Sequence, residues 1–255
     1  MIKTRVALAT HGDNQFCGHS VLTDLAGKTS VAKAIALACG APAMSAEDVA
    51  VLDDVLTCSL AADPRIWPVK VSRLLSSYGG TLAGYGGAHL SLEGARVSPW
   101  PTGDCAQLLA DLAREVGDAG TAADVDRVVD ARVASRSIFA GYGVVFREED
   151  ERMVALEACL RARGRETRRY WRLMRMVETA LLRHKKLPAN AGAGVAAACM
   201  DCGMTPHQTA VFATACASVC FLANAVEGAQ NPAPELQRMP VRYIGHVPRV
   251  TPRGG

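Results

Sequence analysis

The stretch that decides the fold runs Leu187-Pro-Ala-Asn-Ala-Gly-Ala-Gly194 and continues through an alanine-rich segment to Gly203-Met-Thr-Pro206. Its first four residues break one helix, and Asn190 is suited to cap the next. Segments 193–200 and 207–227 have the apolar content and spacing of helices. This part of the chain therefore predicts two successive helices.

The helical pattern extends outward from there. We expect helices over residues 24–37, 45–63, 67–78, 81–92, 103–116 and 122–135, then a loop over 138–150 and a helical region to residue 186, with an interruption at Gly164. Pro99 and Pro101 argue against regular helix over 94–102. No alternating strand pattern appears, and the tail from Asn231 is rich in proline. The sequence therefore predicts an all-α protein.

Composition limits the function classes. The 255 residues suffice for one large domain or two smaller ones, and a net charge of +3 is too small to indicate nucleic acid. Residues 1–8 lack the apolar core of a secretory signal, and no run reaches the roughly 18 apolar residues that span a bilayer. We therefore expect a cytoplasmic protein with neither a membrane nor a nucleic-acid partner.

The nine cysteines fit reduced, mostly buried thiols. Cys199-Met-Asp-Cys202 has the form of a redox or zinc motif, but it lies in an alanine-rich helical run without a second such motif. Core packing is the favoured interpretation, and no metal site is expected. His89, in a glycine-rich helical segment, is likewise interpreted first as a core histidine.

A basic helical face covers part of the region before residue 186. Its members are Arg161, Arg165, Arg168, Arg172 and Arg175, with apolar residues opposite. We favour a solvated cationic face, and keep a phosphate-bearing ligand or an acidic partner as alternatives.

Three blocks carry a resemblance to the citrate synthase superfamily. Leu187-Pro-Ala-Asn190-Ala-Gly192 resembles the family's L-P-x-N-V-D/T, and Gln237-Arg238-Met-Pro resembles its closing R-P. Gly141-Tyr-Gly-Val-Val-Phe-Arg147-Glu-Glu-Asp150-Glu-Arg152 resembles G-F/Y-G-H-x-V…D-P-R, and Gly18–Gly27 resembles the entry motif. Together they cover nearly the whole chain, whose length is similar to that of the short, citryl-CoA-lyase-like members.

The resemblance implies a helical homodimer with a cleft between a large domain (1–100 and 208–255) and a small domain (101–207). In the family, acyl-CoA binds mainly to the small domain, here at Gly141, Gly143 and Arg147, and a keto-acid lies at the cleft floor. CoA or acyl-CoA would be a substrate, with no tightly bound cofactor. Arg152 and Arg238 would hold substrate carboxylates, and Asn190 would either contact substrate or simply cap its helix.

The sequence departs from the family wherever acid–base chemistry is done. Gly192 matches the loop's Asp or Thr, Val144 the G-F-G-H histidine, and Asn224 the histidine of A-H-x-x-E. No histidine occurs near residues 98–103, where H-G-G should fall. Since losing one such group typically costs about 10²–10⁴ in rate, ordinary citrate synthase activity is not expected.

Other residues are candidates for catalysis. Asp63 falls where the family has an imidazole in its D-H-G turn, and Asp104 and Cys105 follow the proline-rich loop, where a helix N-terminus would activate the thiol. One hypothesis is a repurposed carbon–carbon lyase or synthase acting on a small carboxylated acyl-CoA or keto-acid. The alternative is a catalytically inactive homologue that serves as a ligand-binding, regulatory or structural subunit, including a heteromer with an active family member.

Overall fold

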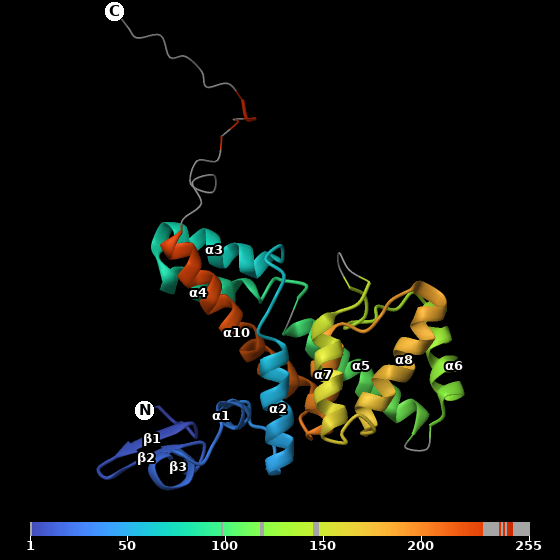
Figure 1. Ribbon diagram of the computed structural model, residues 1–255, viewed down its shortest axis with the longest axis horizontal. Coiled ribbons are helices and arrows are strands. Elements are labelled where there is room, and N and C mark those ends of the chain that lie inside the picture. Colours follow the sequence, from blue (N-terminus) through green and yellow to red (C-terminus); the bar gives the residue numbers. More distant parts are fainter. Residues whose placement is uncertain are drawn as a thin grey trace, which may run out of the picture.

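The structure, a computed structural model, describes residues 2–97, 99–117, 120–144 and 148–231, together with 240, 242 and 244–246. It is built mainly of helices (Figure 1). Their bounds are η1 Val21–Leu25 (a π-helix), α1 Val31–Ala38, α2 Ala46–Cys58, α3 Trp67–Gly79, α4 Thr81–Ser91, α5 Trp100–Val116, α6 Ala122–Ala134, α7 Glu151–Ala162, α8 Arg169–Lys185, α9 Ala191–Asp201 and α10 Pro206–Gln230. The expected all-α class is confirmed.

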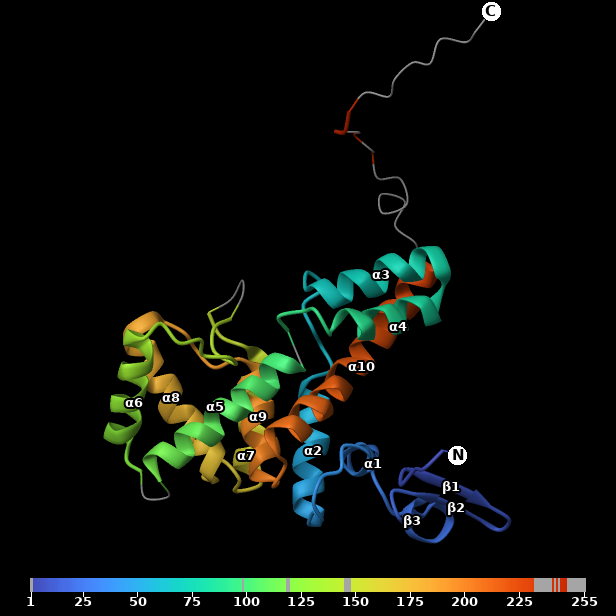
Figure 2. The ribbon, with the colours of Figure 1, turned by 180° about the vertical axis from the view of Figure 1, so that it is seen from behind.

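Two hydrophobic cores organise these helices. The larger one takes residues from α1, α2, α5–α9 and the first half of α10, and the smaller one from α3, α4 and the second half of α10. The long α10 therefore connects the two groups, as the view from behind shows (Figure 2). The predicted division into residues 1–100 plus 208–255 and residues 101–207 stays a prediction.

Side-chain caps define where several helices begin. Ser45, Thr121 and Thr205 each accept a hydrogen bond from the backbone amide three residues on, and the side chain at that position bonds back to the cap. Such reciprocal caps satisfy amides that lack partners in the helix. They explain why α2, α6 and α10 start close to the expected positions.

Two helix expectations need correction. Helix α5 begins at Trp100 rather than Gly103, because Pro99 is its N-cap and Pro101 falls in its first turn, where a missing amide costs nothing. The single helix expected over 24–37 is divided into η1 and α1 by Gly27, whose φ of +71° belongs to the left-handed region.

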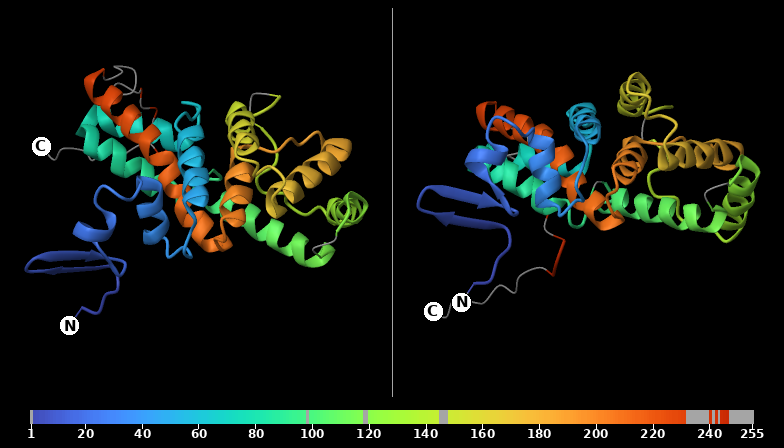
Figure 3. Two further views of the ribbon diagram at one scale, coloured as in Figure 1. Left: turned by 60° about the horizontal axis from the view of Figure 1, so that its bottom comes forward. Right: turned by 90° about the horizontal axis from the view of Figure 1, so that it is seen from below.

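The expectation that the chain has no strands is wrong. Strands β1 Ala7–Thr10, β2 Asp13–Phe16 and β3 His19–Ser20 form a small antiparallel sheet. It projects from the helices near the N-terminus (Figure 3). None of the residues in these strands or in η1 is buried, so the sheet has no core side that an alternating pattern would mark.

Helix α10 bears on the expectation about membranes. Its 25 residues include an 18-residue window of mean hydropathy 1.8, so by length and composition it could cross a bilayer, contrary to the expectation that no run would. In the structure it packs against α3, α4, α5 and α9, with nine of its residues buried, from Thr209 to Gly228. A core helix passes the same hydropathy test, and 44% of this window is buried inside the structure.

Candidate functional site

The glycine-rich loop after α6 is paired with the loop before α9. The amide of Gly143 donates to the carbonyl of Pro188 (2.7 Å), and the amide of Asn190 donates to the carbonyl of Gly141 (2.9 Å). These two bonds bring together the segments that the sequence analysis matched to separate family motifs. The pairing is antiparallel and places residues 141–143 beside the N-terminus of α9.

Tyr142 anchors the paired loops to α8. Its side chain is buried, and its hydroxyl donates to the carbonyl of Met174 (3.1 Å). Burial raises the pKa of Tyr142 well above its ordinary value. The side chain is therefore a neutral structural anchor at ordinary pH.

Only glycine fits at position 141, because of the backbone conformation there and because of the neighbouring atoms. Its φ is +83°, and a Cβ added there would lie 2.6 Å from the Cys105 Sγ and 3.1 Å from the Ala193 Cβ. No side chain can be accommodated without moving α5 or α9. The glycine thus allows the loop backbone to lie directly on both helices.

Asn190 caps α9 and also holds the glycine-rich loop. Its Oδ1 accepts from the amide of Gly192 (2.9 Å), and its Nδ2 donates to the carbonyl of Gly143 (3.0 Å). The capping role that the sequence left open is therefore real. Contact of Asn190 with a substrate stays a prediction.

Arg152, in the first turn of α7, is held by Asp150. The Arg152 Nε donates to Asp150 Oδ1 (2.9 Å) and Nη2 to Oδ2 (2.8 Å), while Oδ2 also accepts from the amide of Ala191 (2.9 Å). The Asp150 side chain is 4% exposed and that of Arg152 35%. Burial would raise the pKa of Asp150, but the bonds from Arg152 and Ala191 outweigh it and lower that pKa.

Asp150 is a residue of this site that sequence reasoning did not single out. It was quoted only as part of the motif around Arg152. The signal was present, since an Asp immediately before a helix is a common N-cap, and here its side chain accepts from the Arg152 amide (3.2 Å). Spacing alone did not show that the same carboxylate also meets α9, 41 positions further on.

The surroundings of Cys105 are opposite to those of an activated thiol. The side chain is fully buried in α5 against Gly141, and burial, together with the nearby Asp104 charge, raises the pKa of Cys105 to about 12. Asp104, the preceding residue, points outward and is exposed. The two candidates are adjacent in sequence but lie in different environments.

Gly192, at the position of the family's catalytic Asp or Thr, has no side chain, and its surroundings leave little room for one. A Cβ on Gly192 would lie 3.0 Å from Asn190 Oδ1 and 3.3 Å from Thr102 Oγ1. The family motif also has an Asn at the position of Asn190, so the base is missing because residue 192 is a glycine, which has no side chain.

The family's histidine positions hold no imidazole in this chain. Val144 is half-buried at the expected histidine position. His89 lies in α4, where its ring packs against Tyr85 (4.7 Å between centroids) and Phe221 (5.3 Å), and burial lowers its pKa. Its Nε2 is buried without a hydrogen-bond partner, so the expected core histidine is only partly satisfied.

Asp63 lies in the connection between α2 and α3. It accepts from the Arg65 side chain at 2.9 Å (Nε to Oδ1) and 2.7 Å (Nη2 to Oδ2). The fork of hydrogen bonds fixes the carboxylate beside the start of α3. Its assignment as a base stays a prediction.

A polar cluster on α3 and α10 occupies the family's A-H-x-x-E positions. Arg73 donates to Asn224 Oδ1 (3.2 Å) and to Glu227 Oε2 (2.6 Å). Asn224 is thus an acceptor for an arginine that the sequence analysis did not notice.

Two further candidates, Arg147 and Arg238, lie outside the residues that the structure describes.

The basic face of residues 161–175 is largely compensated by acids. Arg165 is buried and its Nη2 donates to Asp48 Oδ1 (2.6 Å), so this residue is not on a solvated face as expected. Arg161 pairs with Glu157, and Arg175 pairs with Glu178 and Glu157.

A groove of about 240 Å³ between α6 and α8 is lined by Ala122, Asp126, Arg172, Arg175, Met176, Thr179 and Arg183.

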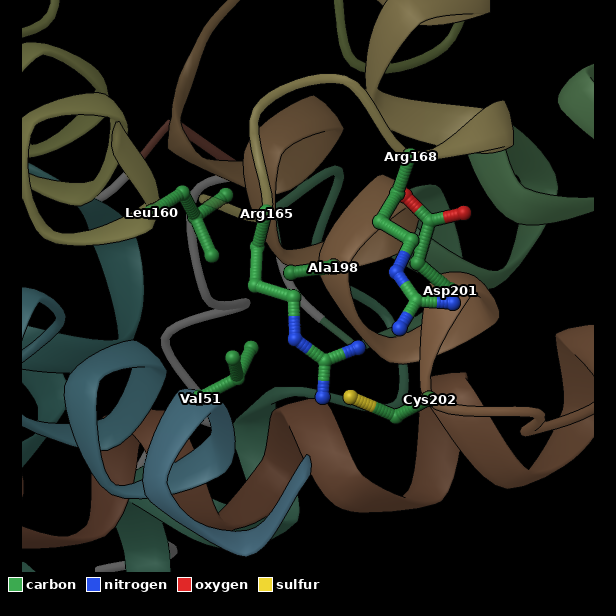
Figure 4. A pocket seen from close by; sticks show the side chains of 7 residues that line it. All are labelled: Val51, Leu160, Arg165, Arg168, Ala198, Asp201 and Cys202. Carbon is green, nitrogen blue, oxygen red and sulfur yellow. The ribbon is translucent and has the colours of Figure 1, made fainter. Parts of the chain in front are cut away.

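A second small cavity surrounds the end of α9 (Figure 4). Asp201 accepts from the amides of Tyr170 (2.8 Å) and Trp171 (2.9 Å), and it lies near Arg165 and Arg168. The cavity holds about 10 Å³, which is room for one water molecule rather than a ligand. Cys202 lines it, and both Cys199 and Cys202 are buried in the larger core, as the packing interpretation expected.

Comparison with solved structures places this fold. No protein-family model matches the chain, and no curated protein matches it. Citryl-CoA lyase from Hydrogenobacter thermophilus superposes with a TM-score of 0.81 at 18% identity, over 99% of this chain and 98% of that one. ATP citrate lyase from Methanosaeta concilii, solved with (3S)-citryl-CoA, gives 0.73 at 15% identity, over 96% of this chain and 42% of that one.

Citrate synthase from Thermotoga maritima gives a TM-score of 0.60 at 18% identity, over 80% of this chain and 56% of that one. The three structures agree on the architecture. The chain has the all-α fold that citryl-CoA lyase and citrate synthase share, at nearly the full length of that citryl-CoA lyase.

Proposed function

We propose that this chain binds a small carboxylated acyl-CoA or keto-acid in a citrate synthase-like cleft and acts on it as a repurposed carbon–carbon lyase or synthase. The observation that carries the proposal is the junction of the 141–143 loop, the N-terminus of α9 and Arg152 through Asp150. The names of the similar structures support the ligand class, because they include citryl-CoA and, in a second ATP citrate lyase, citrate and coenzyme A.

Arg152 keeps donors for a ligand carboxylate. Asp150 takes the Nε–H and one Nη2–H, so one Nη2–H and the two Nη1–H groups have no hydrogen-bond partner among the described residues. A guanidinium with one free edge still offers charge-assisted hydrogen bonds to an anion. Because Asp150 fixes the group in place, little rotamer entropy is lost when a ligand binds.

Proton transfer needs a group that the two paired loops and Cys105 do not provide. Gly192 and Val144 cannot exchange protons, and Cys105 is buried and protonated. Asp63 is the candidate base that we propose, since Arg65 orients its carboxylate. Asp104 is the next choice because it is exposed.

Product analysis tests this proposal. The protein is incubated with citryl-CoA, or with acetyl-CoA and oxaloacetate, and the CoA species are followed by mass spectrometry. We expect turnover that is lost in Asp63→Asn while ligand affinity changes less than about threefold. Turnover that is unchanged in Asp63→Asn would remove this residue from the mechanism.

Gly192 and Val144 favour a second candidate function, a non-catalytic relative that binds ligand or an active homologue. A site whose matched positions hold no proton-transfer side chain fits a subunit that binds without reacting. This candidate predicts ligand binding without turnover, together with co-purification with an active family member. Turnover by the isolated chain would exclude it.

We also propose that the chain forms a homodimer. Leu82 and Leu90 on α4 are 85% and 81% exposed, and Tyr78 on α3 is 61% exposed. The N-terminal sheet packs, among the described elements, only on itself and η1, and such a small sheet is marginal alone. Analytical ultracentrifugation should show a dimer for the parent protein and a monomer for the double variant Leu82→Asp, Leu90→Asp. A monomeric parent protein would contradict this proposal.

The cytoplasmic location stays a prediction.

A further inference from the structure

Two cysteines face each other across α2 and α7. Cys58 is the last residue of α2, and Cys159 lies in α7; both are half-buried, and their thiols interact. The two helices pack against each other and lie side by side in Figure 1. The pair therefore combines mutual proximity with access from solvent.

An ion pair one helical turn away holds these two cysteines opposite each other. The Arg163 Nε donates to Asp54 Oδ2 (2.5 Å), and its Nη2 donates to Asp54 Oδ1 (3.2 Å). Asp54 precedes Cys58 by four residues, and Arg163 follows Cys159 by four. Four residues span about one turn, so the helices run antiparallel with both pairs on the facing sides.

The other cysteines do not combine these properties. All nine lie in the described part of the chain, and Cys105, Cys199, Cys202, Cys216 and Cys220 are buried. Cys39 is half-buried, but its thiol neighbours, Cys199 and Cys216, lie in the core. Cys17 is half-buried in the N-terminal sheet region. Oxidants of small size can reach both members of a close pair only at Cys58 and Cys159.

We propose that Cys58 and Cys159 form a reversible disulfide that ties α2 to α7. The oxidant is a small-molecule disulfide such as oxidised glutathione. One cysteine thiolate attacks it and releases one glutathione, and the second cysteine attacks the resulting mixed disulfide and releases the other. The two cysteine protons end on the two glutathione thiols, so two cysteines are oxidised as one disulfide is reduced.

The environment of the pair sets how fast this occurs. Burial, and then the neighbouring Cys159, raise the pKa of the Cys58 thiol to about 11. Since the thiolate is the attacking form, oxidation should be slow at pH 7 and on the order of 100-fold faster at pH 9. The modification is therefore expected under sustained oxidation rather than as a rapid signal.

A disulfide here would restrain the helix that carries Arg152. Helix α7 begins at Glu151 and reaches Cys159 after two turns, so a bond to α2 fixes its far end. The closed loop of about 100 residues is long, and cross-links of long loops stabilise folded proteins. We expect the thermal midpoint to rise by on the order of 5 °C when the bond forms.

Peptide mapping of the full-length protein tests the proposal without any measurement of activity. The chain is treated with oxidised glutathione at pH 8.5, and free thiols are then alkylated. We expect a Cys58–Cys159 peptide cross-link, an intact mass about 2 Da lower before alkylation, and a raised thermal midpoint, all reversed by a phosphine reductant.

Variants sharpen the result. Cys159→Ser should abolish the cross-link and the midpoint shift, whereas Cys17→Ser, a half-buried cysteine elsewhere, should leave both unchanged. Glutathione retained on either cysteine without the cross-link, or a cross-link between other cysteines, would overturn the proposal. Because the mapping uses the unaltered chain, a variant that fails to fold does not remove the test.

Discussion

Asp150 and Arg152 bind each other through two parallel hydrogen bonds of 2.9 and 2.8 Å, and the same Asp150 carboxylate accepts the first amide of α9. One carboxylate therefore joins the start of α7 to the start of α9. Arg152 cannot be treated as a free surface cation, because its orientation depends on a buried partner. Removal of that partner should affect both the fold and the site.

Asp150→Asn should lower the free energy of unfolding by about 1.5–3 kcal/mol, since a buried, charged hydrogen-bond acceptor is replaced by a neutral one. Urea denaturation monitored by circular dichroism measures this change. Glu149→Gln, an exposed neighbour, is the control and should shift stability by less than about 0.5 kcal/mol. Equal stability of the two variants would contradict the structural role of Asp150.

The contribution of Asp150 should also depend on pH. Its pKa is lowered from 3.8 in the folded state, so its stabilisation is complete above about pH 4 to 5 and is lost as the pH falls through the lowered pKa. The stability gap between the parent protein and Asp150→Asn should therefore narrow between pH 5 and pH 3. A gap that stays constant over this range would argue against an ionised Asp150.

Asp201 should show the opposite pH dependence. Burial raises its pKa from 3.8 to about 6 in spite of the two amide bonds it accepts. The folded state then prefers the protonated form, and the associated stabilisation is lost as the pH rises through 6. Relative to Asp201→Asn, the parent protein should lose up to about 3 kcal/mol between pH 4 and pH 8. Urea denaturation at pH 4 and at pH 8 measures this difference in the free energy of unfolding. A parent protein that gains stability relative to Asp201→Asn between pH 4 and pH 8 would contradict the prediction.

Gly141→Ala should destabilise the protein by about 3 kcal/mol or more. Alanine is strained in the left-handed backbone conformation of residue 141, and its Cβ would lie 2.6 Å from the Cys105 sulfur. Gly164→Ala is a matched control, because its φ is +65° but no atom lies within 4 Å of the added Cβ. It should cost only about 1–2 kcal/mol, measured by thermal or urea unfolding. Equal costs would mean that the loop does not lie on α5 as described.

Two substitutions of Asn190 separate its two roles. Asn190→Ala removes the cap and the bond to Gly143, and should cost about 1–2 kcal/mol. Asn190→Asp keeps an acceptor for the Gly192 amide but cannot donate to the Gly143 carbonyl. Asn190→Asp also sets a carboxylate oxygen against that carbonyl, so it should lower stability although the cap remains, and hydrogen exchange at residues 141–144 should become faster. Unchanged exchange would show that the bond to Gly143 does not hold the loop.

Much of the fold followed from helix periodicity and caps. Ser45, Thr121 and Thr205 mark helix starts in the sequence because their bonding is local, to a residue three positions on. The expected start of α5 was wrong because Pro99 and Pro101 were read as helix breakers. A proline is tolerated at the start of a helix, although it is not tolerated in the interior. The N-terminal strands gave no alternating pattern because neither side is buried.

The candidate site was predictable only in part. The motifs around Gly141 and Asn190 identified two loops, and the structure shows them paired. The bond from Asp150 to the Ala191 amide joins residues far apart in sequence and leaves no local signal. The burial of Cys105 could not be read from its place after a proline-rich loop, because it depends on Gly141 lying over it.

Calorimetric titration with citryl-CoA and with acetyl-CoA tests most directly the proposal that the 141–143 loop, the start of α9 and Arg152 form an anion-binding site. We predict binding by the parent protein that weakens about 10- to 100-fold in Arg152→Ala, the loss expected for one charge-assisted contact. Arg161→Ala, a solvent-exposed arginine on the same helix, should bind as the parent does. Equal affinities of the parent protein and Arg152→Ala, or no binding heat with either thioester, would contradict the account.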